Sequence, residues 1–156
     1  MLSVHKISKN IKDKKILNDV SFSVDFGHIC GLLGPNGAGK TSSFYIIAGL
    51  TTSNGGQIKL AGEDVTNMPM HKRSKLGIKY LPQEPSIFQN LTVYENLLGL
   101  AELTFSSKSK IKNFIEESIE EFSLKNICDL KGRQLSGGQR RKVEIARTLV
   151  SDPKMI

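Results

Sequence analysis

The stretch Gly34-Pro35-Asn36-Gly37-Ala38-Gly39-Lys40-Thr41 decides the fold class of this chain. It satisfies the pattern G-x-x-x-x-G-K-[ST], in which glycines let backbone N–H groups turn inward around phosphate oxygens. The lysine of this pattern bridges the β- and γ-phosphates as a point charge, and the hydroxyl that follows it completes the shell of a Mg²⁺ ion. We therefore predict a phosphate-binding loop in which Lys40 meets the phosphates, Thr41 meets the metal and Ser42 also contacts the ligand.

The residues around the loop predict a strand before it and a helix after it. The near-continuous apolar run from His28 to Leu33 is typical of a strand that is covered on both faces. After Thr41, apolar residues at helical spacing predict a helix that ends at Gly49 or in the turn-forming residues 51–56. Strand, glycine loop and helix in this order are the context in which the pattern binds phosphate.

The rest of the chain divides into a mixed part and a helical part. Period-two patterns and turn residues predict further strands over residues 20–24, 57–61 and 78–81. Thr92 and Glu95 have the spacing of a capping box at the start of a helix. Apolar residues every three or four positions from Ile111 to Phe122 predict a second, amphipathic helix. Together these segments indicate the α/β fold class.

Composition limits the class of protein further. With 156 residues, of which 38% are hydrophobic, the chain has the size of one globular domain, and its apolar runs are too short to cross a membrane. Its N-terminus lacks the pattern of a secretory signal, so we expect a cytoplasmic protein. Cys30 and Cys128 lie far apart and outside any zinc spacing, and we expect both to be buried. The net charge of +7 is spread without interleaved aromatic residues, which favours a phosphate ligand over nucleic acid.

A second glycine loop, Leu135-Ser136-Gly137-Gly138-Gln139, opens a further predicted helix. Alone, it is a helix start with Ser136 as its cap. Together with the phosphate loop, and with Gln83 at the end of a predicted strand between them, it resembles the signature motif of ABC-type ATPases. The resemblance covers essentially the whole chain.

This resemblance implies a P-loop NTPase fold of the ABC type, with a mixed sheet core, an antiparallel N-terminal β part and a helical subdomain. It implies a core over about residues 1–84, a helical subdomain over about 85–135, and the signature helix with the start of the Walker B strand over 135–156. The implied cofactors are ATP and Mg²⁺, with Thr41 and Gln83 as metal-binding residues. In that family, two such domains pair head to tail, so that Ser136 acts on the nucleotide of the partner.

The nucleotide-binding residues implied by the resemblance are Gly34, Pro35, Asn36, Gly37, Ala38, Gly39, Lys40, Thr41, Ser42, Ile11, Ser136, Gly137, Gly138 and Gln139. Lys40, Gln83 and Ser136 are the implied catalytic residues. Ile11 stands where the family usually places an aromatic residue that stacks on adenine. Because isoleucine offers no π face, we expect weaker or less base-selective binding.

Three stretches narrow the resemblance to the cytoplasmic ATPases of lipopolysaccharide export transporters: residues 81–88, 91–97 and 140–147. In such proteins the region after Gln83 docks a membrane subunit at the cytoplasmic face of the inner membrane. The residues expected in the docking groove are Phe88, Leu91, Val93 and Tyr94, each of which is alternatively a core residue. The ATPases of branched-chain amino-acid importers share a similar Leu-Thr-Val-x-Glu-Asn-Leu stretch and are the alternative.

The chain stops at Ile156, before the positions of the family's Walker B aspartate and catalytic glutamate. We therefore expect the chain alone to bind ATP without hydrolysing it. A non-functional truncated fragment is a further alternative. An ABC-type protein that acts on nucleic acid is disfavoured, because the two glycine loops lie in one compact, single cassette.

Overall fold

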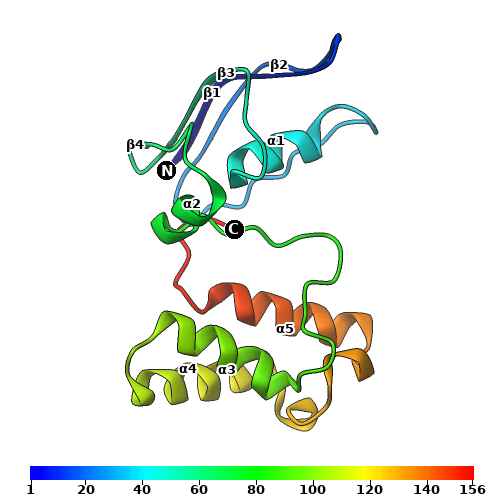
Figure 1. Cartoon of the computed structure of the whole chain (residues 1–156), viewed down its shortest axis with the longest axis vertical. Coiled ribbons are helices and arrows are strands. Elements are labelled where there is room, and N and C mark those ends of the chain that lie inside the picture. Colours follow the sequence, from blue (N-terminus) through cyan, green and yellow to red (C-terminus); the bar gives the residue numbers. More distant parts are fainter. The chain divides into compact units, whose positions relative to one another are not determined.

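The first two strands of the chain form an antiparallel hairpin that is extended into a sheet by the third and fourth (Figure 1). The computed structural model describes residues 1–156, and its four-stranded sheet has the order β2-β1-β3-β4. The strands are β1 (Leu2–Ile11), β2 (Lys14–Val24), β3 (Gly55–Leu60) and β4 (Glu63–Asp64). In β1, Val4 is paired with Phe22 on one side and with Ile58 on the other.

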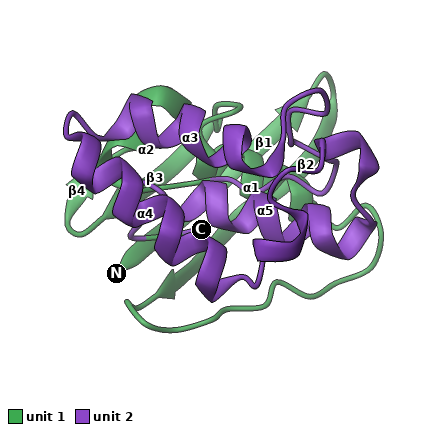
Figure 2. Cartoon of the chain, turned by 90° about the horizontal axis from the view of Figure 1, so that it is seen from below, with its two compact units in different colours: residues 1–79, 155 green, residues 80–154, 156 purple.

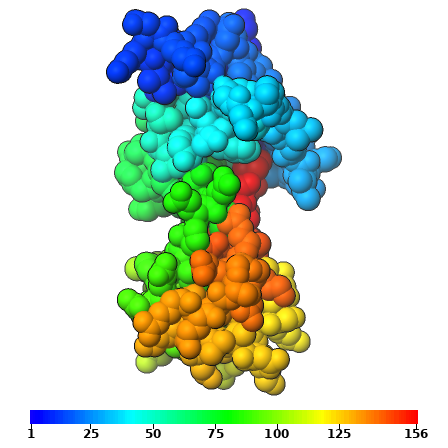
Figure 3. Space-filling view, turned by 90° about the vertical axis from the view of Figure 1, so that its right-hand side faces the viewer, coloured from blue at the N-terminus to red at the C-terminus, as the bar shows by residue number.

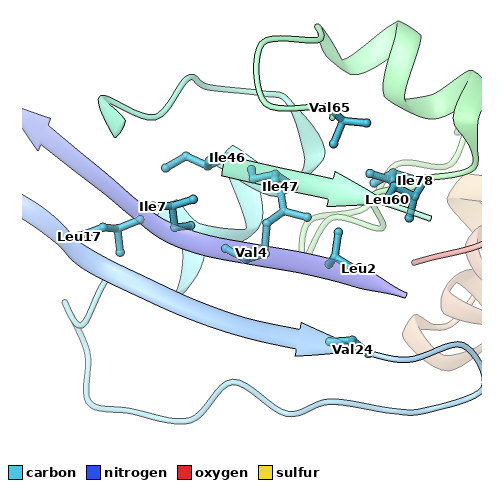
Figure 4. Close-up of a cluster of buried hydrophobic side chains, with 11 residues drawn as sticks. Leu2, Val4, Ile7, Leu17, Val24, Ile46, Ile47, Leu60, Val65 and Ile78 are labelled. Carbon is cyan, nitrogen blue, oxygen red and sulfur yellow. The ribbon is translucent and has the colours of Figure 1, made fainter. Parts of the chain in front are cut away.

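Two compact units divide the chain: residues 1–79 with 155, and residues 80–154 with 156 (Figure 2). The first contains the sheet, α1 (Lys40–Ala48) and α2 (Met70–Leu76). Its core joins alternate residues of the strands to the buried face of α1 (Figure 4). The buried residues are Leu2, Val4, Ile7, Leu17, Val24, Ile46, Ile47, Ile58, Leu60, Val65 and Ile78. Each such aliphatic side chain contributes about 1.5–3 kcal/mol by leaving water.

The strand expected over His28–Leu33 is not formed, and this prediction was wrong. The segment is irregular, and Ile29 and Leu33 are 102% and 93% exposed. The physical reason is the lack of a pairing partner, because the four strands of the sheet pair only with one another. Cys30 is exposed as part of this segment, so the expectation that it is buried was also wrong. In Figure 3 the light-blue region after the blue strands lies on the surface of its unit.

The strand expected over residues 78–81 is reduced to a single parallel bridge between Ile78 and Met155. The backbone N–H of Lys79 donates to the carbonyl of Met155 at 2.8 Å, and the N–H of Met155 donates to the carbonyl of Gly77 at 3.1 Å. Met155, expected at the start of a strand, thus makes one strand-like contact within the first unit.

The second unit is helical. It contains α3 (Val93–Thr104), α4 (Lys108–Glu121), α5 (Gly137–Leu149) and short 3-10 turns at Lys125–Ile127 and Gly132–Gln134. Its core residues are Ile87, Val93, Leu97, Ile115, Leu124, Leu135, Val143 and Ala146. The capping box predicted for Thr92 and Glu95 is confirmed, since the N–H of Glu95 donates to Thr92 Oγ1 and the N–H of Thr92 donates to the Glu95 carboxylate.

The structure thus combines an antiparallel sheet with helices. No helix of the structure combines the length and the hydropathy that crossing a bilayer requires.

Candidate functional site

The phosphate loop connects the irregular segment to the first turn of α1, with Gly39 as the N-cap of that helix. Gly37 and Gly39 have φ angles of 82° and 84°, which L side chains rarely adopt. At Gly39 a Cβ atom would also collide with the side chain of Leu17 and come within 2.9 Å of the carbonyl oxygen of Ile16. Glycine at this position therefore lets the start of α1 lie directly against β2.

The N-terminus of α1 has no side chain that caps it. The first N–H groups of a helix lack partners inside the helix and carry partial positive charge. Neither an acidic residue nor a capping hydroxyl occupies this end, so its donors remain available to an anion. The arrangement fits the phosphates of a nucleotide.

The ammonium group of Lys40 lies over its own loop. Its Nζ donates to the carbonyl oxygens of Gly34 at 2.6 Å and Pro35 at 2.7 Å. The loop is closed further by the N–H of Ala38, which donates to the carbonyl of Pro35 at 3.2 Å. The charge of Lys40 is thus held where an anion in the loop would meet it.

The hydroxyl groups that follow Lys40 differ in exposure. Thr41 is exposed and Ser42 is half-buried. Ser43 is 2% exposed, and its hydroxyl donates to the carbonyl oxygen of Gly39 at 3.1 Å. The oxygen of Thr41 therefore suits a hard cation, whereas Ser43 serves the helix itself.

Ile11 ends β1 at the tip of the hairpin and is 55% exposed. Lys12 follows it with a φ of 51°, and this turn leads into β2 at Lys14. An exposed isoleucine presents an apolar surface against which a planar ring can pack.

The remaining candidate residues lie in the second unit. Gln83 is exposed in the irregular segment before α3. Ser136 is the N-cap of α5: its Oγ accepts the N–H of Gln139 at 3.3 Å, and its own N–H donates to the Gln139 side chain at 2.9 Å. Gly137 and Gly138 are exposed, and nothing lies within 4 Å of a Cβ built on either. An anion has free access to this helix end.

Three charged side chains of α5 hold the segment on both sides of Gln83, from Pro82 to Ser86. Arg141 Nη1 donates to the carbonyl oxygen of Pro82 at 2.8 Å, and Glu144 Oε1 accepts the N–H of Ser86 at 2.7 Å. Arg147 Nη1 donates to the carbonyl oxygen of Ser86 at 2.8 Å. We had assigned no role to these residues. The available signal was their spacing of three, which places all three on one side of a helix.

Of the four residues expected in a docking groove, one is a core residue. Val93 is fully buried, so its assignment to the groove was wrong, because the first turn of α3 packs inward. Phe88, Leu91 and Tyr94 are 53%, 39% and 44% exposed. The guanidinium carbon of Arg147 lies 4.7 Å from the centre of the Phe88 ring, and burial lowers the pKa of Arg147.

Comparison with known proteins identifies the family. The sequence model described as ABC transporter matches residues 17–156 of this chain. The chain belongs to the ABC transporter family. It is 47% identical over its whole length to the lipopolysaccharide export system ATP-binding protein LptB of Haemophilus influenzae, and 42% identical over 99% of its length to LptB of Escherichia coli K12. It spans 65% of the length of each of these relatives.

Solved structures give the same family and fold. The ATP-binding cassette MJ1267 of an ABC transporter superposes with a TM-score of 0.89 at 30% identity, over 99% of this chain and 66% of that one. The ADP conformation of the same cassette has a TM-score of 0.86 at 31% identity, with the same two coverages. These likenesses confirm the P-loop NTPase fold of the ABC type.

Proposed function

We propose that this chain is the ATP-binding part of an ABC transporter subunit whose ATP binding and hydrolysis drive export of lipopolysaccharide or a related lipid-linked glycan. The observation that carries the proposal is the phosphate loop, in which the open end of α1 and the ammonium of Lys40 meet. The identity of 42–47% to proteins named for lipopolysaccharide export supports the substrate class.

In this role the backbone N–H groups of residues 34–41 surround the phosphates, and Lys40 moves from the carbonyls of Gly34 and Pro35 to the β- and γ-phosphates. Thr41 would hold a Mg²⁺ ion, which would neutralise phosphate charge. Ile11 covers one face of the base. Because it lacks a π system, we expect the triphosphate to supply most of the affinity, so that ATP and GTP bind with similar strength.

The signature loop acts on a second nucleotide. Ser136 and the N–H groups of Gly137 and Gly138 form an anion site at the end of α5, and in a head-to-tail pair they close over the γ-phosphate held by the partner chain.

Membrane subunits are the proposed partners, with the chain peripheral at the cytoplasmic face of the inner membrane. Phe88, Leu91 and Tyr94 present exposed apolar surface next to the segment that α5 holds. Large apolar side chains of this kind anchor protein interfaces. The expected interaction is with a helix of the permease.

Calorimetric titration with ATP, with and without Mg²⁺, tests the nucleotide part of the proposal. We expect Mg²⁺ to raise the affinity of the unaltered chain for ATP, and Thr41→Ala to lose most of that gain while Thr52→Ala retains it. A Mg²⁺ dependence unchanged in Thr41→Ala contradicts the assigned metal contact.

Co-purification with the membrane subunits of a lipopolysaccharide exporter tests the docking part. Phe88→Ala is expected to reduce recovery of the complex. Leu103→Ala is the matched control, because Leu103 is 84% exposed and lies at the end of α3. Equal recovery of the two variants contradicts the proposed surface.

A further inference from the structure

A buried guanidinium group binds the C-terminal end of α1. Arg73 of α2 is 2% exposed. Its Nη1 donates to the carbonyl oxygens of Ile46 at 2.6 Å and Ile47 at 2.8 Å. Its Nε donates to the carbonyl of Met68 at 2.8 Å, and its Nη2 donates to the carbonyl of Thr66 at 2.8 Å. The last carbonyls of a helix lack partners within the helix and carry partial negative charge, so a cation is favoured there.

The charge of Arg73 is compensated by these carbonyl dipoles, because no carboxylate forms an ion pair with it. Burial lowers the pKa of Arg73 and the charge of Asp64 raises it, but an arginine stays protonated at neutral pH. Its planar fork places several donors in fixed directions. This geometry ties two backbone segments, the end of α1 and residues 66–68, to one side chain.

Gly49 permits this close approach. It ends α1 with a φ of 80°, and its N–H donates to the carbonyl of Ile46. A Cβ atom at this position would lie 2.9 Å from the backbone nitrogen of Met70 and 3.0 Å from Nε of Arg73. Only glycine lets the start of α2 lie against the end of α1.

Both ends of α1 are therefore held within the first unit. The N-terminal end lies against β2 through Gly39, and the C-terminal end lies against Arg73. A helix of nine residues behaves as a rod about 13 Å long at 1.5 Å per residue. A shift at its last turn is therefore transmitted to its first turn, where Lys40 and Thr41 lie.

We propose that Arg73 is a positioning residue for the phosphate loop. By binding the last turn of α1, it sets the direction in which the first N–H groups of α1 and the ammonium of Lys40 face the phosphates. This role rests on the proposed nucleotide function and extends it to a residue outside every motif of the site.

The test compares the affinities of the full 156-residue chain for Mg-ATP and for inorganic tripolyphosphate, measured by calorimetric titration at a temperature where each variant is folded. Arg73→Met keeps an unbranched apolar stem and removes the guanidinium donors. Leu2→Ala is the matched control, since it destabilises the same core from β1. Lys72→Met controls for loss of a neighbouring exposed charge.

We expect Arg73→Met to raise the Kd for Mg-ATP about tenfold. The Kd for tripolyphosphate is expected to rise by the same factor, because the defect lies in the phosphate contacts. Leu2→Ala and Lys72→Met are expected to stay within about twofold of the unaltered chain. An equal loss of affinity in Arg73→Met and Leu2→Ala, or none in Arg73→Met, overturns the positioning role. Absence of binding by the unaltered chain overturns the proposed function and this role with it.

Two further variants keep the test decisive if Arg73→Met does not fold. Arg73→Lys retains the charge and some donors, and we expect a smaller rise in both Kd values than a variant without donors would give. Gly49→Ala pushes α2 away from α1, and the same direction of change is expected. Unaltered affinity for both ligands in both folded variants overturns the proposal.

Discussion

Asp64, at the end of β4, accepts hydrogen bonds on both carboxylate oxygens. Thr66 donates to Oδ1 through its hydroxyl at 2.6 Å and through its N–H at 2.9 Å, and Gln57 Nε2 donates to Oδ2 at 2.6 Å. These bonds favour the charged carboxylate, with that of the Thr66 hydroxyl the largest contribution, and they lower the pKa of Asp64 to about 2.

The pKa of Asp64 gives a prediction about pH. Because the folded-state pKa lies below the ordinary value, the stabilisation by this carboxylate is complete above about pH 4 and is lost as the pH falls towards 2. Carbon-13 NMR of the carboxyl group is expected to show a midpoint near 2, and Thr66→Val is expected to raise it. Thr104→Val, in the other unit, is the control; a midpoint that does not respond to Thr66→Val contradicts the assigned cause.

Exposure of single residues is what the sequence predicts least well at this scale. Cys30 and Val93 have similar apolar character, yet one is exposed and the other is fully buried. Val93 is buried because it lies in the first turn of α3, which packs inward. Cys30 is exposed because the segment 28–33 has no strand to pair with. Both causes depend on the packing of whole elements.

At the scale of elements, α5 begins at the signature loop and also binds the segment around Gln83 through its side chains. Glu144 is 4% exposed, and its two carboxylate oxygens accept hydrogen bonds from Ser86 and from Arg141. One carboxylate therefore accepts hydrogen bonds both from the N–H of Ser86 and from the guanidinium of Arg141. Through it, the segment after Gln83 and the signature helix are joined.

Glu144→Ala is expected to lower the free energy of unfolding by about 2–3 kcal/mol, because it leaves a backbone donor and a guanidinium with fewer partners. Urea denaturation followed by circular dichroism measures the change. Glu120→Ala, an exposed position of α4, is expected to change stability by less than about 0.5 kcal/mol. Equal effects of the two substitutions would show that the contacts of Glu144 do not stabilise the fold.

In the irregular segment 28–33, in contrast to Glu144, we expect substitutions of apolar residues to leave the stability of the fold nearly unchanged. Ile29→Ser and Leu33→Ser are expected to change the free energy of unfolding by less than about 0.5 kcal/mol, since both side chains are in water. Ile58→Ala, in the core of the same unit, is expected to cost about 2–5 kcal/mol. A large loss of stability in Leu33→Ser would mean that this segment is packed in solution.

Elements defined by local rules were predictable, and those defined by distant partners were not. The capping box of Thr92 follows from a spacing of three residues, and the helix after Ser136 follows from the same rule. The strand expected over 28–33 needed a neighbouring strand, and no local pattern supplies one. The bond between Ser86 and Glu144 joins residues 58 positions apart, which lies beyond any periodicity argument.

At the scale of the whole molecule, the family was predicted from the order of three motifs along the chain: the phosphate loop, Gln83 and the signature loop. The phosphate loop and Ile11 belong to the first unit, whereas Gln83 and the signature loop belong to the second. The family match over residues 17–156 and the TM-score of 0.89 agree with that order.

The central claim is that the loop at residues 34–41 binds a nucleoside triphosphate through Lys40. The most direct measurement is thermal unfolding of the 156-residue chain with and without Mg-ATP, beside Lys40→Ala and the exposed control Lys72→Ala. At a ligand concentration about 100 times the Kd, binding to the folded state adds about 2.7 kcal/mol, which raises Tm by about 5–10 °C for a chain of this size. We predict this rise for the unaltered chain and for Lys72→Ala, and none for Lys40→Ala. No rise in the unaltered chain, or an equal rise in Lys40→Ala, contradicts the claim.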